Sequence, residues 1–227
     1  MKASAIAAVG GVSLVGAVGL LAFLSGGRRA PVMVSLSGTA RDEEAIARML
    51  AAIDRHIARA KSLHADQIIA VGTESLRAAE NSEEFLSALR KTGVELRVIS
   101  GDDEARLSFR SVVESLPMPS SGRRSVIEIG GGSTELIVGG KTPERWASVK
   151  MGSVRLHERF VRSDPPTEAE TKALTEAIET ELAKLPSVEG ELVALAGTAT
   201  TVAALHLGLR EYDGRKVDGM RIATTTM

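Results

Sequence analysis

The alternation of helical and strand patterns along the chain is the feature that most constrains its fold. From Asp42 to about Leu63, apolar residues recur with helical spacing, and the apolar run Gln67–Val71 has the length of a buried strand. The alternation continues to about residue 209, which predicts an α/β protein. Further helices are expected over 74–91, 102–116, from 167 and over 199–209, and further strands over 94–99, 125–129, 135–138, 147–151 and 192–195.

A change of composition in the middle of the chain predicts two lobes. Pro117–Arg124 combines two prolines with small polar residues, which is typical of a linker. We therefore expect a first lobe over residues 1–118, a second over 119–227, and a seam near residue 120. A length of 227 residues is sufficient for such an arrangement.

Charge and composition exclude several classes of function. The net charge is -1, so no basic excess favours binding to a nucleic-acid backbone, and we expect no nucleic-acid partner. The absence of cysteine excludes disulfides, thiol catalysis and cysteine-based zinc sites. The chain has 22 glycines, and this number directs attention to sites that are built from backbone groups.

The N-terminal segment, residues 3–27, carries no charge and has three interpretations. Its length suits a signal sequence or a membrane anchor. Alternatively, Ala5–Val9 and Val12–Val15 form buried strands of the first lobe, joined by a turn at Gly10 and Gly11. The third interpretation is a corrupted or artificial terminus. We favour the buried strands, and membrane contact follows only if residues 3–27 are an anchor.

A glycine-rich turn between two strands is the strongest chemical signal. Gly130, Gly131 and Gly132 follow one expected strand, and Ser133 precedes the next. Consecutive glycines allow backbone amides to surround an anion such as phosphate. Carboxylates on both sides of the turn, at Glu128 and Glu135, suit a hydrated divalent cation shared with a phosphate chain. The alternative is an ordinary hairpin turn with surface acids.

A second turn has a related pattern. Strand 192–195 leads through Gly197 and Thr198 into a helix. Amides at a helix N-terminus attract phosphate, and the Thr198 hydroxyl adds a donor. The alternative is a plain strand–helix loop in which the threonine caps the helix.

Two further clusters have both a structural and a functional interpretation. The acids Asp102, Asp103 and Glu104 at a helix start complement the helix dipole, or one of them activates a water molecule. Arg77, at another strand–helix junction, binds phosphate or pairs with a surface acid.

Taken together, six segments resemble the exopolyphosphatase/guanosine pentaphosphate phosphatase (Ppx/GppA) family, in its order and spacing, from about Glu43 to Arg221. A set of this kind is far more specific than any single motif. The segments are Gly72–Asn81, Val98–Leu107, Ile127–Glu135, Met151–Phe160, Asp164–Pro166 and Ala196–Thr201.

The resemblance implies a two-lobe ribonuclease-H-like fold of the actin, sugar kinase and heat-shock ATPase superfamily. It implies an enzyme that removes terminal phosphate from polyphosphate or guanosine pentaphosphate, with Mg²⁺ as the cofactor. It also implies a cytoplasmic location, and it leaves open whether the protein is a homodimer. By position, Glu104 matches the family's catalytic base, and Arg77 matches its motif arginine. The range Gly130–Ser133 matches the phosphate loop, and Glu135 the second acid.

The sequence departs from the family pattern in three places. The loop acid is Glu128 instead of Asp, and Ala8–Ser13 is an altered version of the first phosphate loop. The chain also stops at Met227, before the closing strands and helix of the second lobe, so we expect that lobe to be incomplete. The alternative function is therefore a catalytically weakened protein that binds polyphosphate or guanosine polyphosphate as a sensor.

Overall fold

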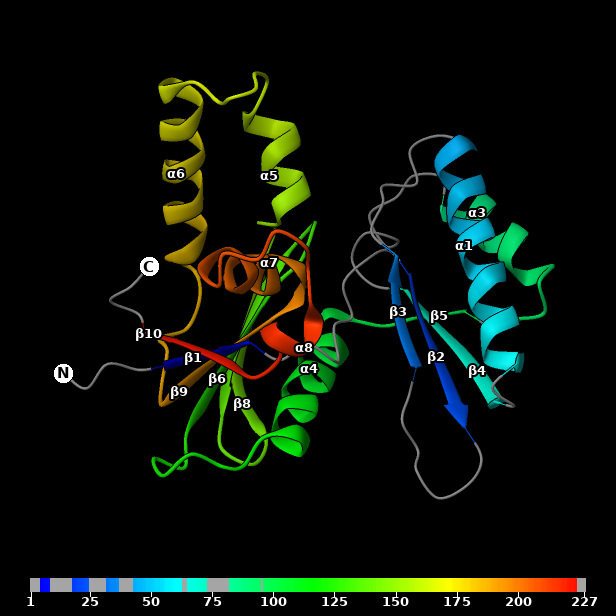
Figure 1. Ribbon diagram of the computed structural model, residues 1–227, viewed down its shortest axis with the longest axis horizontal. Coiled ribbons are helices and arrows are strands. Elements are labelled where there is room, and N and C mark those ends of the chain that lie inside the picture. The colour runs from blue at the N-terminus through cyan, green and yellow to red at the C-terminus, as the bar shows by residue number, and fades with distance from the viewer. Residues whose placement is uncertain are drawn as a thin grey trace. The chain divides into compact units, whose positions relative to one another are not determined.

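The computed structural model describes residues 5–8, 18–24, 32–36, 43–62, 65–72, 82–94 and 96–223. Contacts divide the chain into two units, both of which combine helices with a sheet (Figure 1). The large unit consists of Met1–Ser13 and Ala105–Met227, and the small unit of Leu14–Glu104. The expected α/β fold class is confirmed.

The small unit contains a four-stranded sheet with the strand order β3-β2-β4-β5. Strand β2 runs antiparallel to β3 and β4, whereas β4 and β5 are parallel. The elements are β2 (Val18–Leu24), β3 (Val32–Leu36), α1 (Glu43–Ser62), β4 (Ala65–Gly72), α3 (Ser82–Arg90) and β5 (Leu96–Val98).

The core of the small unit forms where the predicted helical stripe meets α3. Ile53 and Ile57 of α1 are buried in one cluster with Phe85 and Leu89 of α3. Ala70 of β4 belongs to the same cluster. The period of the apolar residues in α1 therefore identified its buried face correctly.

The large unit contains a six-stranded sheet with the order β10-β1-β9-β6-β7-β8. Its strands are β1 (Ala5–Ala8), β6 (Arg124–Ile129), β7 (Thr134–Gly139), β8 (Pro143–Val149), β9 (Glu191–Leu195) and β10 (Met220–Ala223). Its helices are α4 (Gly101–Ser115), whose first turn is counted with the small unit, α5 (Ser153–Phe160), α6 (Glu168–Leu182), α7 (Ala196–His206) and α8 (Gly214–Val217).

The directions of the strands decide which loops share an edge of this sheet. Strands β6, β7 and β8 form an antiparallel meander. Strand β9 runs parallel to β6 on one side and to β1 on the other. The carboxyl ends of β1, β9 and β6 therefore lie at one edge.

Helix α4 covers the face of the sheet that carries the core of the large unit. Phe109 and Val112 of α4 pack with Val126 of β6, Ile137 of β7 and Val193 of β9 in one buried cluster. Because alternate residues of a strand share a face, Glu128 lies on the same face of β6 as Val126. The fold thus places an acidic residue beneath a helix.

The division between the units differs from the predicted seam near residue 120. It falls between Glu104 and Ala105, at the first turn of α4. Pro117–Arg124, predicted as the linker between lobes 1–118 and 119–227, connects α4 to β6 inside the large unit. The buried side chain of Arg124 donates to the Pro117 carbonyl at 2.6 Å and pairs with Glu191 at 2.7 Å, which holds this loop to the sheet.

The N-terminal segment forms strands where the structure describes it. The expected strand Ala5–Val9 is observed as β1, but it pairs with β9 and β10 in the large unit, not in the first lobe as predicted. Val12–Val15 and the turn at Gly10 and Gly11 lie outside the described residues. Among the helices that the structure describes, none is long and apolar enough to cross a membrane.

Candidate functional site

The two phosphate turns predicted from the sequence lie at the same edge of the large sheet. Glu128 of β6 is the register partner of Leu195 of β9, and the two strands are parallel. The glycine turn at 130–133 begins two residues after Glu128, and Gly197 follows Leu195 by the same interval. In open α/β sheets, ligands bind outside the carboxyl ends of the parallel strands, so this edge is the candidate site.

The glycine turn is held by the first turn of α5. The Gly130 amide donates to the Ser133 carbonyl at 3.0 Å, which closes the turn. The carbonyls of Gly130 and Gly131 accept from the amides of Ser153 and Arg155 at 2.9 and 3.0 Å. The Gly132 carbonyl accepts from Nε of Arg155 at 2.9 Å. All three glycine carbonyls are therefore bonded to residues 153–155.

The opposite side of the turn presents amides. In a planar trans peptide the N–H points away from the carbonyl of the preceding residue. Since the carbonyls of residues 130–132 are directed at α5, the amides of Gly131, Gly132 and Ser133 point away from it. In the described part of the chain these three amides donate to no other group. Successive backbone amides on one side of a turn form the kind of nest that binds anions.

Gly152 allows the turn to approach α5 this closely. A Cβ atom at Gly152 would lie 2.3 Å from the carbonyl carbon of Gly131, which is far inside van der Waals contact. A Cβ at Gly131 would lie 3.2 Å from Cγ2 of Val154, so a side chain there would point toward α5. Thr134, at the end of the turn, donates its hydroxyl to the Met151 carbonyl.

Glu128 and Glu135 form a buried carboxylate pair on the face covered by α4. The two residues are register partners on β6 and β7, and their exposed fractions are 2% and 4%. Ser108 of α4 donates its hydroxyl to Glu128, and Ser148 of β8 donates to Glu135 at 2.6 Å. Neither serine was predicted as a site residue, because hydroxyls 20 and 13 residues away leave no local signal.

Burial changes the protonation of Glu128. The pKa of Glu128 is raised to about 7, mainly by loss of solvation; the hydrogen bond from Ser108 opposes this increase, and the charge of Glu135 adds to it. Near neutral pH Glu128 therefore gains and loses a proton readily. The alternative of a hairpin with surface acids is excluded, because both acids are buried.

The carboxylate pair fits the ligands that Mg²⁺ uses. Mg²⁺ is commonly bound by one or two carboxylates together with substrate phosphates and water. Within the described ranges, no three or more His, Cys, Asp or Glu residues lie close enough to hold a metal by themselves. Glu128 and Glu135 therefore match a cation that is shared with a ligand better than one enclosed by protein.

Glu104 is the buried member of the three acids at the start of α4. Its exposed fraction is 5%, whereas Asp102 and Asp103 are exposed. Asp103 belongs to the helix cap, because its carboxylate accepts from Ser100 Oγ at 2.7 Å and its amide donates to the same atom. Glu104 lies one turn before Ser108 on the same face of α4. The functional interpretation of the cluster therefore concentrates on Glu104.

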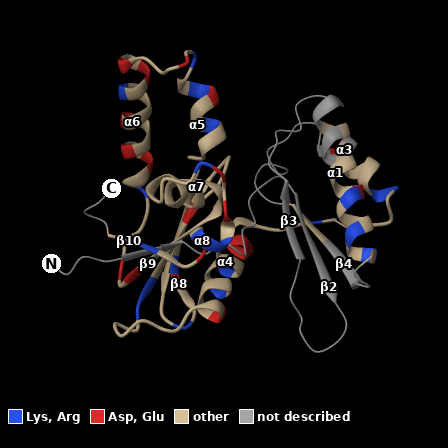
Figure 2. Cartoon of the chain, in the orientation of Figure 1, with Lys and Arg blue, Asp and Glu red and all other residues tan. Residues whose placement is uncertain are grey.

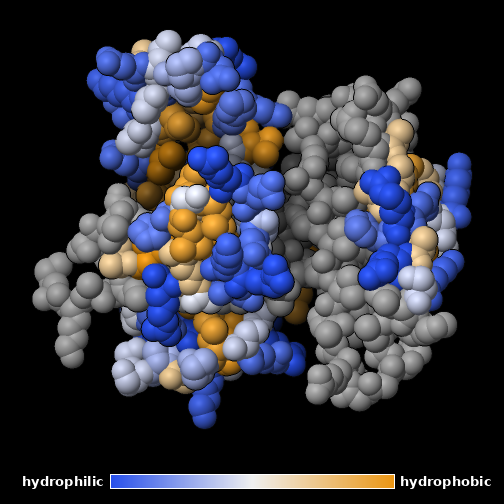
Figure 3. Space-filling model, viewed as in Figure 1, coloured by the Kyte–Doolittle hydropathy of each residue, from blue (hydrophilic) through white to orange (hydrophobic). Residues whose placement is uncertain are grey.

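The second turn leads into α7 without a side-chain cap. The N-cap residue is Leu195 and no side chain caps the helix, so the alternative interpretation, in which a threonine is the cap, is wrong. Gly197 is exposed and Thr198 is half-buried in the first turn. Figure 3 shows hydrophobic atoms at the surface over α7, where Leu205 and Leu207 are exposed. The residues of α7 nearest the carboxyl end of β9 are those of its first turn, which includes Gly197 and Thr198.

Two predicted elements of the site remain outside this description. Arg77 lies between β4 and α3, in residues that the structure does not describe. Of the altered loop Ala8–Ser13, only Ala8 is described, at the carboxyl end of β1 beside Ala194.

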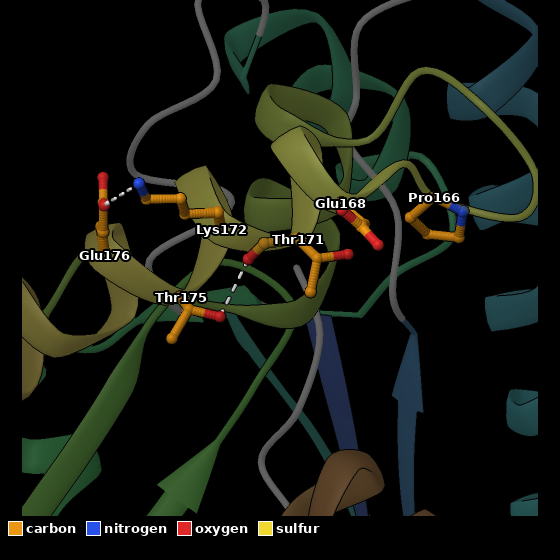
Figure 4. Close-up of a pocket in the computed structure, with 6 residues that line it drawn as sticks. All are labelled: Pro166, Glu168, Thr171, Lys172, Thr175 and Glu176. Carbon is orange, nitrogen blue, oxygen red and sulfur yellow. Dashed lines mark hydrogen bonds and ion pairs between the residues drawn. The ribbon is translucent and has the colours of Figure 1, made fainter.

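A surface pocket on α6 is unrelated to these residues. Its volume is about 410 Å³, and no predicted site residue lines it (Figure 4). Glutamates predominate on this helix (Figure 2), and its lysine, Lys172, pairs with Glu176 at 3.9 Å. The lining residues are Pro166, Glu168, Thr171, Lys172, Thr175 and Glu176.

Comparison with known proteins identifies relatives over most of the chain. The model of the Ppx/GppA phosphatase family matches residues 34–224. Exopolyphosphatase 2 of Mycobacterium tuberculosis is 34% identical over 191 residues, which are 79% of this chain and 59% of that protein. Exopolyphosphatase 1 of the same organism is 38% identical over 143 residues, 62% of this chain and 41% of that protein.

A solved structure agrees with these matches. The Ppx/GppA enzyme of Aquifex aeolicus is 31% identical, with a TM-score of 0.66 over 95% of this chain and 75% of that one. The chain thus spans about three fifths or less of the length of the two curated relatives.

Proposed function

Because the chain belongs to the Ppx/GppA phosphatase family, we propose that it removes the terminal phosphate from polyphosphate or guanosine pentaphosphate. The observation that carries the proposal is the nest of three amides at Gly131–Ser133, beside the buried pair Glu128 and Glu135. Its relatives named exopolyphosphatase support the polyphosphate substrate. A cytoplasmic location and a homodimer are part of the same proposal.

Backbone donors suit a substrate that is a chain of negative charges. The amides of Gly131–Ser133 bind the terminal phosphate, and the first turn of α7, with Gly197 and Thr198, binds a further phosphate. The parallel strands β6 and β9 that carry these turns are neighbours, about 4.8 Å apart. Two adjacent phosphate sites at one sheet edge favour a polyphosphate over a single phosphate ester.

Glu128 and Glu135 are the residues that would hold Mg²⁺. When bound, the cation neutralises charge on the phosphate oxygens and stabilises the charge that develops during transfer. Ser108 and Ser148 orient the two carboxylates through their hydrogen bonds. Arg77, from its match to the family motif, is proposed to bind phosphate as well.

The reaction is a hydrolysis. The oxygen of a water molecule attacks the terminal phosphorus, the bond from phosphorus to the bridging oxygen breaks, and the shortened chain leaves with that oxygen. Glu104 accepts the proton of the water, a role that comes from its match to the family's base.

The test is phosphate release by the purified chain from long-chain polyphosphate and from guanosine pentaphosphate, each with Mg²⁺. Replacing Glu104 with Gln should lower kcat by roughly 10²–10⁴-fold with little change in substrate affinity. Asp103→Asn is the matched control, since it removes a neighbouring acid that caps the helix. Equal activity of Glu104→Gln and the wild type would remove Glu104 from the mechanism.

One observation favours the second candidate function, a sensor that binds without turnover. The resemblance places Asp where this chain has Glu128, and the pKa of Glu128 is raised to about 7. A carboxyl that is half protonated near neutral pH holds a cation less well. Binding of polyphosphate with no phosphate release at any pH between 6 and 9 would favour the sensor.

A further inference from the structure

Arg155 makes a hydrogen bond to the glycine turn that depends on the identity of its side chain. The Gly130 and Gly131 carbonyls accept from backbone amides of α5, at 2.9 and 3.0 Å, which almost any residue supplies. The Gly132 carbonyl instead accepts from Nε of Arg155 at 2.9 Å. Of these three bonds, only the one from Nε of Arg155 can be removed by a side-chain substitution that leaves the backbone donors in place.

This bond controls the direction of one amide of the nest. The Gly132 carbonyl and the Ser133 amide belong to the same planar peptide and point in opposite directions. Glycine has no Cβ to restrict rotation of that peptide, so its orientation depends on what the carbonyl meets. With Nε of Arg155 as its partner, the carbonyl faces α5 and the Ser133 amide faces the nest.

The position of α5 also depends on these contacts. None of its eight residues, all within the described part of the chain, is buried. Its first turn is therefore fixed by hydrogen bonds to the glycine turn and by the close approach of Gly152 to Gly131, not by burial in a core. Arg155 is half-buried at this junction.

We infer that Arg155 is a positioning residue of the phosphate-binding turn, which keeps the Ser133 amide directed at the terminal phosphate. The inference rests on the proposed function, because it assumes that the nest binds phosphate. Nε lies in a planar group at a fixed distance along the side chain, and lysine has no donor at that place. The role therefore requires arginine, and a positive charge alone does not replace it.

The experiment compares Arg155→Met and Arg155→Lys with two controls. Arg159→Met removes the same charge from α5, at a residue whose guanidinium lies over Phe160 and not on the turn. Ser153→Ala removes a hydroxyl that is 3.4 Å from the Gly130 carbonyl but keeps the amide that bonds it. All variants are made in the full chain, and thermal unfolding is measured for each.

With polyphosphate and Mg²⁺, both Arg155 variants should lose about 10–100-fold in kcat/KM, the effect of a misplaced binding group. Both controls should stay within about twofold, the range in which a lost contact is energetically small. Activity of Arg155→Lys close to that of the wild type would overturn the inference, since charge would then be sufficient. Equal losses in Arg155→Met and Arg159→Met would overturn it as well.

A second measurement does not require turnover. Inorganic tripolyphosphate is added to labelled protein, and amide chemical shifts are followed for Gly131, Gly132 and Ser133. The wild type should show shifts at all three amides, and Arg155→Lys should lose the shift of Ser133. If the wild type releases no phosphate but shows these shifts, the proposed function fails and the inference stands. Absent shifts in the wild type, or equal shifts in both proteins, overturn it.

Discussion

Two glycine turns at one edge of the large sheet share a sequence pattern but differ in what surrounds them. The turn at 130–133 lies against α5, with its three glycine carbonyls bonded and Gly152 in close contact. The turn at Gly197 opens a helix directly, and a Cβ atom added at Gly197 would meet nothing within 4 Å. The conformation of the first turn is held by residues 152–155, which lie about 20 residues later in the chain, whereas the second turn is part of the start of its own helix.

The residues at the base of the two turns differ as well. Glu128 and Leu195 are register partners on parallel strands, so they occupy equivalent places. Only the first turn therefore has a carboxylate beneath it, paired with Glu135. The comparison teaches that the first turn depends on supporting residues from other elements, while the second depends on the start of its own helix.

Removing the acid beneath the first turn should have the largest effect on stability. The pKa of Glu128 is raised from 4.5 to about 7, so between these values the folded state holds a proton that the unfolded chain has released. The free energy of unfolding therefore falls as pH rises through this window, by on the order of 3 kcal/mol. In Glu128→Gln the free energy of unfolding should not fall in this way. The measurement is urea unfolding of both proteins at pH 5 and at pH 8, without divalent cations.

A control for this prediction uses the hydroxyl partner. Ser108→Ala keeps the acid but removes the bond that lowers the pKa of Glu128, so the fall should begin at the same pH and extend to higher pH. Parallel pH dependence in Glu128→Gln and the wild type would show that the acid is not buried as described.

Gly152→Ala should have the next largest effect, because it forces the first turn away from α5. The added Cβ overlaps the backbone of Gly131, and overpacking of this kind costs about 1–3 kcal/mol. Displacement of the turn by about 1 Å should also lower kcat/KM roughly 10²-fold. Chemical unfolding and phosphate release are the measurements. A variant with wild-type values in both would contradict the close packing of turn and helix.

Gly197→Ala should have the smallest effect and completes the comparison. The site has room for a methyl group, and alanine favours a helix over glycine by up to about 1 kcal/mol. The free energy of unfolding should therefore be unchanged or slightly higher, and polyphosphate affinity should stay within about twofold, since the first-turn amides remain. A loss as large as that of Gly152→Ala would remove the difference between the turns.

Much of this arrangement follows from local patterns in the sequence. Helix α1 and the strands β4, β6 and β9 were predicted within a few residues, because the period of apolar residues reflects which face is buried. The helix expected from residue 167 is observed as α6, and Thr167 and Glu170 form a capping box at its start, which is again a local signal. Helix α5 was not predicted from the sequence. The hydrogen bonds by which it holds the glycine turn were therefore not predicted either.

The sequence by itself determined the α/β class, the glycine turn and the family, since each depends on residue types at short and regular spacing. Only the tertiary structure decided which groups meet at the site. Ser108 bonds Glu128, and Arg155 bonds Gly132, across 20 and 23 residues of chain. The pairing of β1 with β9 joins residues still farther apart. Such contacts depend on how separate elements pack, and the burial that raises the pKa of Glu128 exists only after they have packed.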